Sequence, residues 1–131
     1  MLQHIQAGAV STLPFSSAVV VNDLVFVSGQ ASVDPETGAI VTDSFEGEMR
    51  RSFQNLERVL AAVQCDLSHL VSVRCYVDHQ HRLEEFNRLY RELLPSPHPA
   101  RTTLIGVLGN DFLKFEVDAI ARRSSINGQE I

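Results

Sequence analysis

Apolar residues near the start of the chain fall in short runs that are typical of β-strands. Residues 17–22 and 24–28 are rich in β-branched and aromatic side chains, and Asn22-Asp23 joins them. Asn and Asp tolerate the backbone dihedrals of a tight turn, so the two runs predict a β-hairpin. Residues 2–6 form a further candidate strand.

A longer apolar pattern follows, and its period is that of a helix. Its members lie four or three residues apart and form a single stripe: Met49, Phe53, Leu56, Leu60 and Val63. Asp43 or Ser44 stands just before them as a suitable N-cap, and acidic residues occupy the first turn. We therefore expect a helix that begins near Ser44 and ends near Gln64.

The second half of the chain repeats both patterns. Residues 70–77 alternate, which predicts a strand with one face made of Val71, Val73, Cys75 and Val77. Residues 83–93 predict a second helix, and its apolar stripe consists of Phe86, Leu89, Tyr90 and Leu93. The prolines that follow, Pro95, Pro97 and Pro99, exclude a helix there and predict an extended approach to Arg101.

Two more strands are predicted at the end of the chain. They cover residues 101–107 and 114–122, and a turn at Gly109-Asn110-Asp111 joins them. The last strand has an apolar face made of Phe115, Val117, Ala119 and Ala121. Its other face carries Glu116, Asp118 and Ile120.

The order of these elements is β-β-α-β-α-β-β, with the possible extra strand at the start, and it predicts an α+β fold. Two helices can pack on only one face of a mixed sheet of five or six strands. The other face must then be solvated or covered by another subunit. Apolar residues are spread over those strands, and this favours an oligomer.

Length and charge restrict the class of protein further. A chain of 131 residues is the size of one domain, so we expect a single domain over residues 1–131, with a frayed tail at 124–131. The net charge is -5, which disfavours nucleic acid as a partner. No apolar run approaches the length that spans a bilayer, and the start lacks the features of a secretory signal. Two cysteines, interpreted as buried thiols, fit a reduced cytoplasmic protein.

Several segments together resemble the RidA/YjgF family of reactive-intermediate deaminases. The matching segments run from about residue 3 to residue 123. They are Pro14-Phe15-Ser16, Leu24-Val25-Phe26-Val27-Ser28-Gly29-Gln30, Asn55-Leu56, Asp66-Leu67, Phe86-Asn87-Arg88-Leu89-Tyr90, Pro99-Ala100-Arg101-Thr102-Thr103 and Phe115-Glu116-Val117-Asp118-Ala119-Ile120-Ala121. Each segment is unspecific when taken alone, whereas their joint order and spacing are specific.

The resemblance implies a chorismate-mutase-like subunit that assembles as a homotrimer with ligand clefts between subunits. It implies hydrolysis of 2-imino acids and their enamine forms to 2-keto acids and ammonia. Neither a metal nor an organic cofactor takes part in that reaction. A trimer would also cover the sheet face that the two helices leave bare.

Two residues are expected to carry out the chemistry. Arg101 matches the arginine that binds the substrate carboxylate, and a guanidinium suits this task because it forms a bidentate pair. Asp118 falls where the family has a glutamate that orients the attacking water, and it is one methylene shorter. A structural carboxylate paired with an arginine is the alternative interpretation of Asp118. Glu116 lies on the same face and is the second candidate.

Four further residues are predicted to contact the substrate. Gly29 would let the backbone approach the ligand, although a glycine at a strand end or bulge is an equal alternative. Phe15 replaces a family tyrosine and keeps an apolar wall without the hydroxyl. Asn87 matches a family asparagine that is foremost structural, and Thr103 replaces a cysteine, so no thiol chemistry is expected.

Other functions remain open on this basis. The altered residues Phe15 and Asp118 are compatible with a non-catalytic module that binds a small carboxylate, or with a deaminase of another enamine, such as an aminomuconate or aminoacrylate. Ribonuclease activity agrees poorly with the net charge. The cluster Asp78-His79-Gln80-His81 lacks a third ligand of the right kind, so no metal site is predicted.

Overall fold

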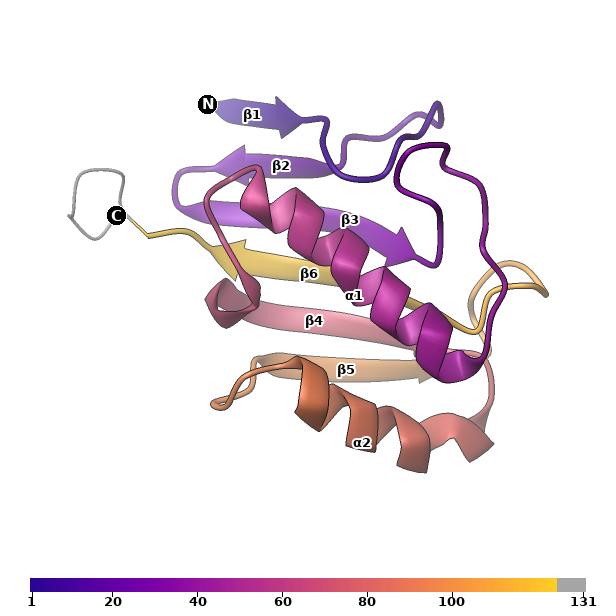
Figure 1. The fold of residues 1–131 in the computed structure, drawn as a ribbon. Coiled ribbons are helices and arrows are strands. Elements are labelled where there is room, and N and C mark those ends of the chain that lie inside the picture. Colours follow the sequence, from indigo (N-terminus) through magenta and orange to yellow (C-terminus); the bar gives the residue numbers. More distant parts are fainter. Residues whose placement is uncertain (125–131) are drawn as a thin grey trace.

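Both ends of the chain contribute strands to one sheet, and two long helices lie on the same side of it (Figure 1). The computed structural model describes residues 1–124. The strands are β1 (Leu2–Ile5), β2 (Ala18–Val21), β3 (Leu24–Ala31), β4 (Leu70–Val77), β5 (Ala100–Ile105) and β6 (Phe115–Arg122). The helices are α1 (Phe45–Ala61) and α2 (Leu83–Leu93), and short 3-10 turns cover Leu67–His69 and Gln80–Arg82. The predicted α+β class and two-helix layer are confirmed.

The strand order is β1-β2-β3-β6-β4-β5. All neighbours are antiparallel except β4 and β5, which run parallel. A parallel pair needs a crossover connection, and α2 supplies it. The hairpin predicted at Asn22-Asp23 joins β2 to β3, and Asn22 has a φ of 55°, as a tight turn requires. β1 and β5 are the two edges of the sheet.

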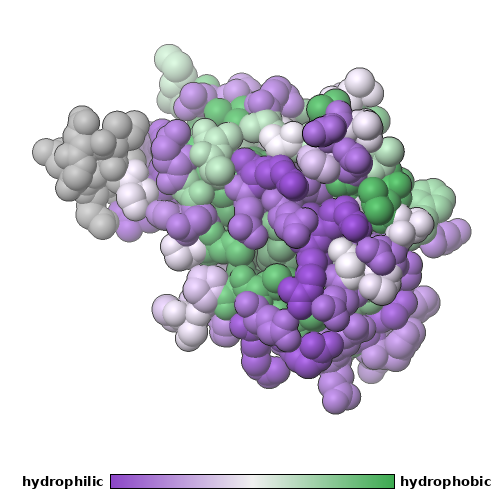
Figure 2. Space-filling view, in the orientation of Figure 1, coloured by the Kyte–Doolittle hydropathy of each residue, from purple (hydrophilic) through white to green (hydrophobic). Residues whose placement is uncertain are grey.

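The helix-covered face of the sheet forms the core. Val25, Val73 and Phe115 are fully buried there beneath α1 and α2. Phe53 of α1 stacks on Phe115 with ring centroids 5.7 Å apart, and Phe86 of α2 lies 6.0 Å from the same ring. These contacts join both helices to β6. The outer surface of this side is largely hydrophilic (Figure 2).

The first helix begins as predicted and ends earlier than predicted. The Ser44 hydroxyl caps it by accepting a hydrogen bond from the Gly47 amide at 3.1 Å. It ends at Ala61, because Gln64 adopts a left-handed φ of 59° and turns the chain away. The Cys65 amide then bonds back to the Leu60 carbonyl at 2.8 Å.

Two strands depart from simple alternation. The sequence predicts that Val71 shares a face with Val73, Cys75 and Val77, and this is wrong: Val71 is 47% exposed, whereas those three residues and Leu70 are buried. The pairing of β4 with β6 shifts register between Leu70 and Ser72, and this irregularity reverses the facing of the first residues. A second shift interrupts β3 between Val27 and Gln30. Pairing with β6 resumes at Gln30, so β3 continues to Ala31 instead of ending at residue 28.

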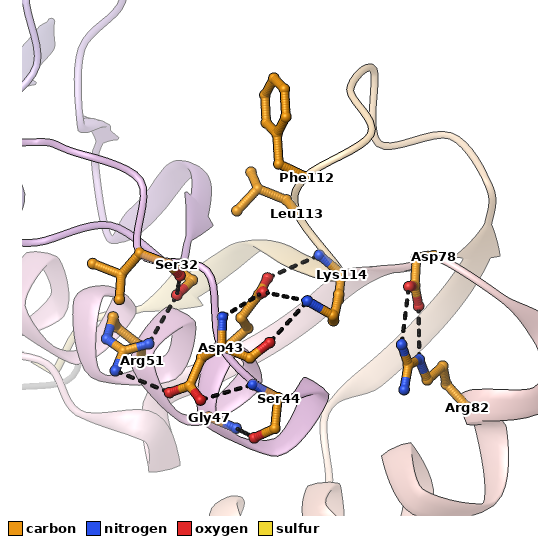
Figure 3. Close-up of polar contacts among 12 residues, drawn as sticks. Ser32, Asp43, Ser44, Gly47, Arg51, Asp78, Arg82, Phe112, Leu113 and Lys114 are labelled. Carbon is orange, nitrogen blue, oxygen red and sulfur yellow. Dashed lines mark hydrogen bonds and ion pairs between the residues drawn. The ribbon is translucent and has the colours of Figure 1, made fainter.

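A buried ion pair fixes the start of β6 to the start of α1 (Figure 3). Glu48 is fully buried, and the Lys114 ammonium lies 3.1 Å from its carboxylate. The Lys114 amide donates to the other Glu48 oxygen at 2.9 Å, and the Asp43 amide also donates to Glu48. Both oxygens of this buried carboxylate therefore have hydrogen-bond donors. This network anchors the chain at Lys114, two residues before Glu116.

Both cysteines are buried and form no disulfide, as the sequence predicted. Within the part of the chain that the structure describes, no helix has the length and apolarity needed to cross a membrane. The predicted frayed tail lies outside the described residues from position 125 onward.

Candidate functional site

A groove of about 960 Å³ lies on the sheet face opposite the helices. Outward-facing residues of β3, β6 and β4 form its floor, and the loops after β1 and β3 form its walls. Three of the residues predicted from the sequence, Phe15, Gly29 and Asp118, line it together. Glu116 and Arg74 join them there.

Gly29 lies in the bulge of β3 and makes room for a carboxylate. A Cβ atom at this position would be 2.6 Å from Oε2 of Glu116, closer than real Cβ contacts allow. The absence of a side chain at position 29 therefore permits the observed position of Glu116. The interpretation of Gly29 as a bulge glycine is confirmed by the register shift between Val27 and Gln30, whereas its approach to a ligand stays a prediction.

Hydrogen bonds attach the Phe15 loop to the same bulge. The Ser28 hydroxyl donates to the Ser16 carbonyl at 2.6 Å, and the Ser28 amide donates to the Ser17 carbonyl at 3.0 Å. The Phe15 carbonyl accepts a hydrogen bond from the side-chain Nε2 of Gln6 at 3.3 Å. Phe15 remains 47% exposed. The loop thus holds an aromatic wall beside Gly29.

Glu116 has the properties expected of a group that handles protons. Burial and the neighbouring charge of Asp118 raise the pKa of its carboxyl. Its side chain makes no hydrogen bond or ion pair with any other residue among 1–124. From the sequence alone, Glu116 is the second candidate after Asp118. Its position two residues away on the same strand face was the signal that pointed to it.

Asp118 is held by two neighbours on β4. Nε of Arg74 donates to one carboxylate oxygen at 3.0 Å, and the Tyr76 hydroxyl donates to the other at 2.6 Å. Burial and this hydrogen bond raise the pKa of Tyr76 to about 12. The sequence analysis did not single out Arg74 or Tyr76, because their approach to Asp118 depends on strand register. Asp118 thus has the arginine partner that the structural interpretation expected.

Arg101 lies on the opposite side of the sheet, at the edge strand β5. Its guanidinium carbon is 4.8 Å from the ring centroids of both Phe86 and Tyr90 of α2. Arg101 and Asn87 line one small hollow together with Pro99 and His98. Among the described residues, no carboxylate pairs with Arg101. The aromatic rings therefore orient a cation whose hydrogen-bonding fork is available.

Strand register explains why the predicted residues form two groups. Arg101 and Thr103 pair with Val73 and Cys75, which face the helices, whereas Asp118 pairs with Arg74, which faces away. The groove and the Arg101 hollow share no lining residue. Within one chain, Phe15, Gly29 and Asp118 come together, and so do Asn87 and Arg101. Thr103 is partly exposed on the strand beside Arg101.

The histidine-containing segment at 78–81 has ordinary structural contacts. The His79 and His81 rings stack with centroids 5.4 Å apart, and Nε of Arg82 donates to Asp78 at 3.2 Å (Figure 3). No group of three His, Cys, Asp or Glu side chains within residues 1–124 is arranged to hold a metal ion.

Comparison with known proteins adds a family to this geometry. Residues 6–123 match the family model described as Endoribonuclease L-PSP. A RutC family protein of Pyrococcus abyssi is 32% identical over 109 residues, which cover 82% of this chain and 85% of the relative. Reactive Intermediate Deaminase A of Arabidopsis thaliana, a chloroplastic protein, is 32% identical over 108 residues, or 82% of this chain and 58% of the relative.

Two more similarities concern a named activity and the fold. The human protein named 2-iminobutanoate/2-iminopropanoate deaminase is 26% identical over 108 residues, covering 82% of this chain and 79% of the relative. The crystal structure of RidA from an Antarctic Psychrobacter superposes with a TM-score of 0.84, covering 92% of this chain and 99% of that one. At 24% identity, the Psychrobacter structure shows a shared fold.

Proposed function

The chain belongs to the RidA/YjgF family, whose model is described as Endoribonuclease L-PSP, and on this premise we propose that it hydrolyses 2-imino acids to 2-keto acids and ammonia. The observation that carries the proposal is the guanidinium of Arg101, which is oriented by two rings and has no carboxylate partner among residues 1–124. Such a fork matches a substrate carboxylate. Imine hydrolysis also needs a group that moves protons, and Glu116 meets this requirement.

Glu116 suits proton transfer better than Asp118 does. Both oxygens of Asp118 already accept hydrogen bonds from Arg74 and Tyr76. Glu116 is unpaired within the described chain, and its raised pKa brings it nearer to the operating pH. We therefore assign the predicted catalytic task of Asp118 to Glu116 and regard Asp118 as its charged neighbour.

The reaction follows from these groups. Water attacks the imine carbon of the iminium, forming a C–O bond, and one water proton passes to the Glu116 carboxylate. Glu116 then gives this proton to the amino nitrogen of the carbinolamine. The C–N bond breaks, the hydroxyl becomes the keto oxygen, and its proton leaves with ammonia as ammonium. Arg101 holds the carboxylate throughout, which orients the imine carbon.

The two groups of residues would be joined by assembly. Arg101, Asn87 and Thr103 belong to the edge strand β5 and to α2, whereas Glu116, Gly29 and Phe15 lie on the uncovered sheet face. A homotrimer in which the edge of one subunit meets the uncovered face of the next would build a complete site at each interface. No metal or organic cofactor is required in this mechanism.

The lining of the groove supports, within this proposal, a substrate with an apolar side chain. Large apolar residues that are exposed in the single chain gather around it: Val10, Leu13, Phe15, Phe26 and Ile40. Phe15 presents a ring without a hydroxyl. An imino acid with an aliphatic or aromatic side chain fits these walls better than an aminomuconate, because the second carboxylate of an aminomuconate would lie against apolar groups.

The test is hydrolysis of imino acid generated in situ by an amino-acid oxidase or dehydratase, with semicarbazide trapping the imine that remains. We expect wild type to accelerate keto-acid formation and Arg101→Ala to lower kcat/KM about a hundredfold. Arg88→Ala is the matched control, since Arg88 is an exposed arginine that pairs only with Glu92 among the described residues. Full activity of the Arg101→Ala protein would rule out the mechanism.

Two other functions have specific supporting observations. Phe15 and the engaged Asp118 are compatible with a module that binds a small carboxylate without turnover, which calorimetry with a keto acid would detect. The description of the family favours ribonuclease activity. The net charge of -5 and the two carboxylates in the groove oppose it, and steeply salt-dependent RNA binding would reverse this conclusion.

We place the protein in the cytoplasm as part of the same proposal. Two buried cysteines without a disulfide suit a reducing compartment. Cell fractionation with an antibody against the chain would test this assignment.

A further inference from the structure

The carboxylates Glu116 and Asp118 occupy alternate positions of β6, so both side chains project from the uncovered face. Together with Arg74 they are the titratable residues that line the groove. The charge of Asp118 adds to burial in raising the pKa of Glu116.

Side chains of β4 form hydrogen bonds with Asp118 and none with Glu116. Asp118 receives one donor on each oxygen, from Arg74 at 3.0 Å and from Tyr76 at 2.6 Å. Tyr76 is the register partner of Glu116, yet its hydroxyl turns toward Asp118. Both oxygens of Asp118 are therefore already engaged as hydrogen-bond acceptors.

No other side chain among the described residues forms a hydrogen bond or ion pair with the Glu116 carboxyl. On the β3 side it faces Ala31 and Gly29, which have no titratable side chain. Lys114, directly before this strand, is directed to Glu48 instead. The one charge in this set that acts on Glu116 is Asp118, and it raises the pKa of Glu116 in addition to the effect of burial.

We infer that Arg74 and Tyr76 are positioning residues that engage both oxygens of Asp118, so that Glu116 is the carboxylate of the pair that accepts and returns a proton. This inference rests on the proposed function and deepens it, because it explains how two adjacent carboxylates take different roles. Tyr76 remains a donor over the assay range, since its pKa is about 12. Arg74 remains charged, because the hydrogen bond to Asp118 raises its pKa further.

The inference predicts opposite effects of two substitutions on Glu116. In Arg74→Gln the charge of Asp118 is less compensated, and the pKa of Glu116 should rise by about half a unit or more. In Asp118→Asn the neighbouring charge is lost, and the same pKa should fall by a similar amount, about half a unit. Loss of structure alone would not move one pKa in two directions.

Carbon-detected NMR titration of the Glu116 carboxyl measures this directly in the whole protein, and Glu116→Gln identifies its resonance. The acid limb of the profile of kcat/KM against pH should move with it. Arg88→Gln is the control, because it removes an arginine from an exposed pair on α2 and should shift neither quantity. Tyr76→Phe should change the pKa of Glu116 in the same direction as Arg74→Gln.

The results separate this inference from the proposed function. An unchanged Glu116 pKa in both variants, or a shift of the same sign in both, would overturn the inference even in an active enzyme. NMR shifts of opposite sign support it whether or not turnover is observed. Absence of imine hydrolysis by wild type would instead refute the proposed function.

Discussion

At the scale of single residues, neighbouring groups set the chemistry more than residue type does. Glu116 and Asp118 are both carboxylates on one strand face, yet one is unpaired within the described chain and the other accepts two hydrogen bonds. Arg101 differs from the chain's paired arginines in resting on two aromatic rings without a carboxylate partner among residues 1–124. These differences make Arg101 and Glu116 the best candidates for the chemistry.

Gly29→Ala should reduce activity while leaving the fold intact. The new Cβ would lie 2.6 Å from the Glu116 carboxylate, a flexible group that can move away. A displacement of about 1 Å in a catalytic group can cost about a hundredfold in rate. We expect a loss of kcat/KM on this scale with an almost unchanged Tm, measured by the semicarbazide assay and by thermal unfolding.

Two variants check that the effect of Gly29→Ala acts through Glu116. Gly109→Ala should show the reverse pattern, because Gly109 has a φ of 75° and no neighbour within 4 Å of its added Cβ. It should lose about 1 kcal/mol of stability and keep its activity. In a Glu116→Gln background, Gly29→Ala should add little further loss, and additive losses would contradict this explanation.

At the scale of elements, the site depends on how β6 is anchored. Lys114 directly precedes this strand and forms the ion pair with Glu48 at the beginning of α1 (Figure 3). The same helix is capped by Ser44 and packs Phe53 against Phe115. β3 pairs with β6, and the bulge of β3 leaves space for Glu116. The ion pair, the packing of Phe53 on Phe115 and the pairing with β3 therefore together hold β6 and its two carboxylates in place.

Lys114→Met should lower the free energy of unfolding by about 3 kcal/mol. The substitution leaves the fully buried Glu48 without its cation, and removal of one partner of a buried pair costs about this much. Urea denaturation at one fixed protomer concentration measures the change.

The control for this prediction is the exposed pair of Arg88 and Glu92. Arg88→Met should change stability by no more than about 0.5 kcal/mol. The double variant Glu48→Gln/Lys114→Met should recover part of the loss, since it removes the unpaired charge. Equal losses in the single and double variants would show that the ion pair is not the cause.

At the scale of the whole molecule, the two groups of site residues lie on opposite faces of one sheet. Arg101 faces α2, and Glu116 faces the uncovered side. A single chain therefore presents two separate groups of candidate residues, which the proposed trimer would join across each interface. The exposed apolar residues around the groove are consistent with a surface that an assembly covers in part.

Mixing two inactive variants tests this arrangement. Arg101→Ala and Glu116→Gln subunits, unfolded together at equal amounts and refolded, should regain about a quarter of the wild-type activity, because random cyclic assembly gives that share of interfaces with both native residues. The same variants mixed without unfolding should regain little. No recovery after refolding, in assemblies of normal size, would place each site within one chain.

Most of the fold could be predicted from the sequence because its signals are local. The period of Met49, Phe53 and Leu56 predicts a helix, and Asn22 marks a turn, without reference to any other part of the chain. Alternation also identified which residues of β6 face the core. It failed at Val71, where an irregular pairing with a distant strand reverses the pattern.

Candidate site residues could be proposed from the sequence, whereas the contacts that distinguish them could not be predicted. The motifs around Arg101, Gly29 and Glu116 can be recognised in the sequence itself. The partners of Asp118 do not, since Arg74 is 44 residues away and meets it only through the register of β4 on β6. Register, bulges and hydrogen-bond partners arise when distant segments pack together. That packing leaves Glu116 unpaired in the described chain and separates it from Arg101.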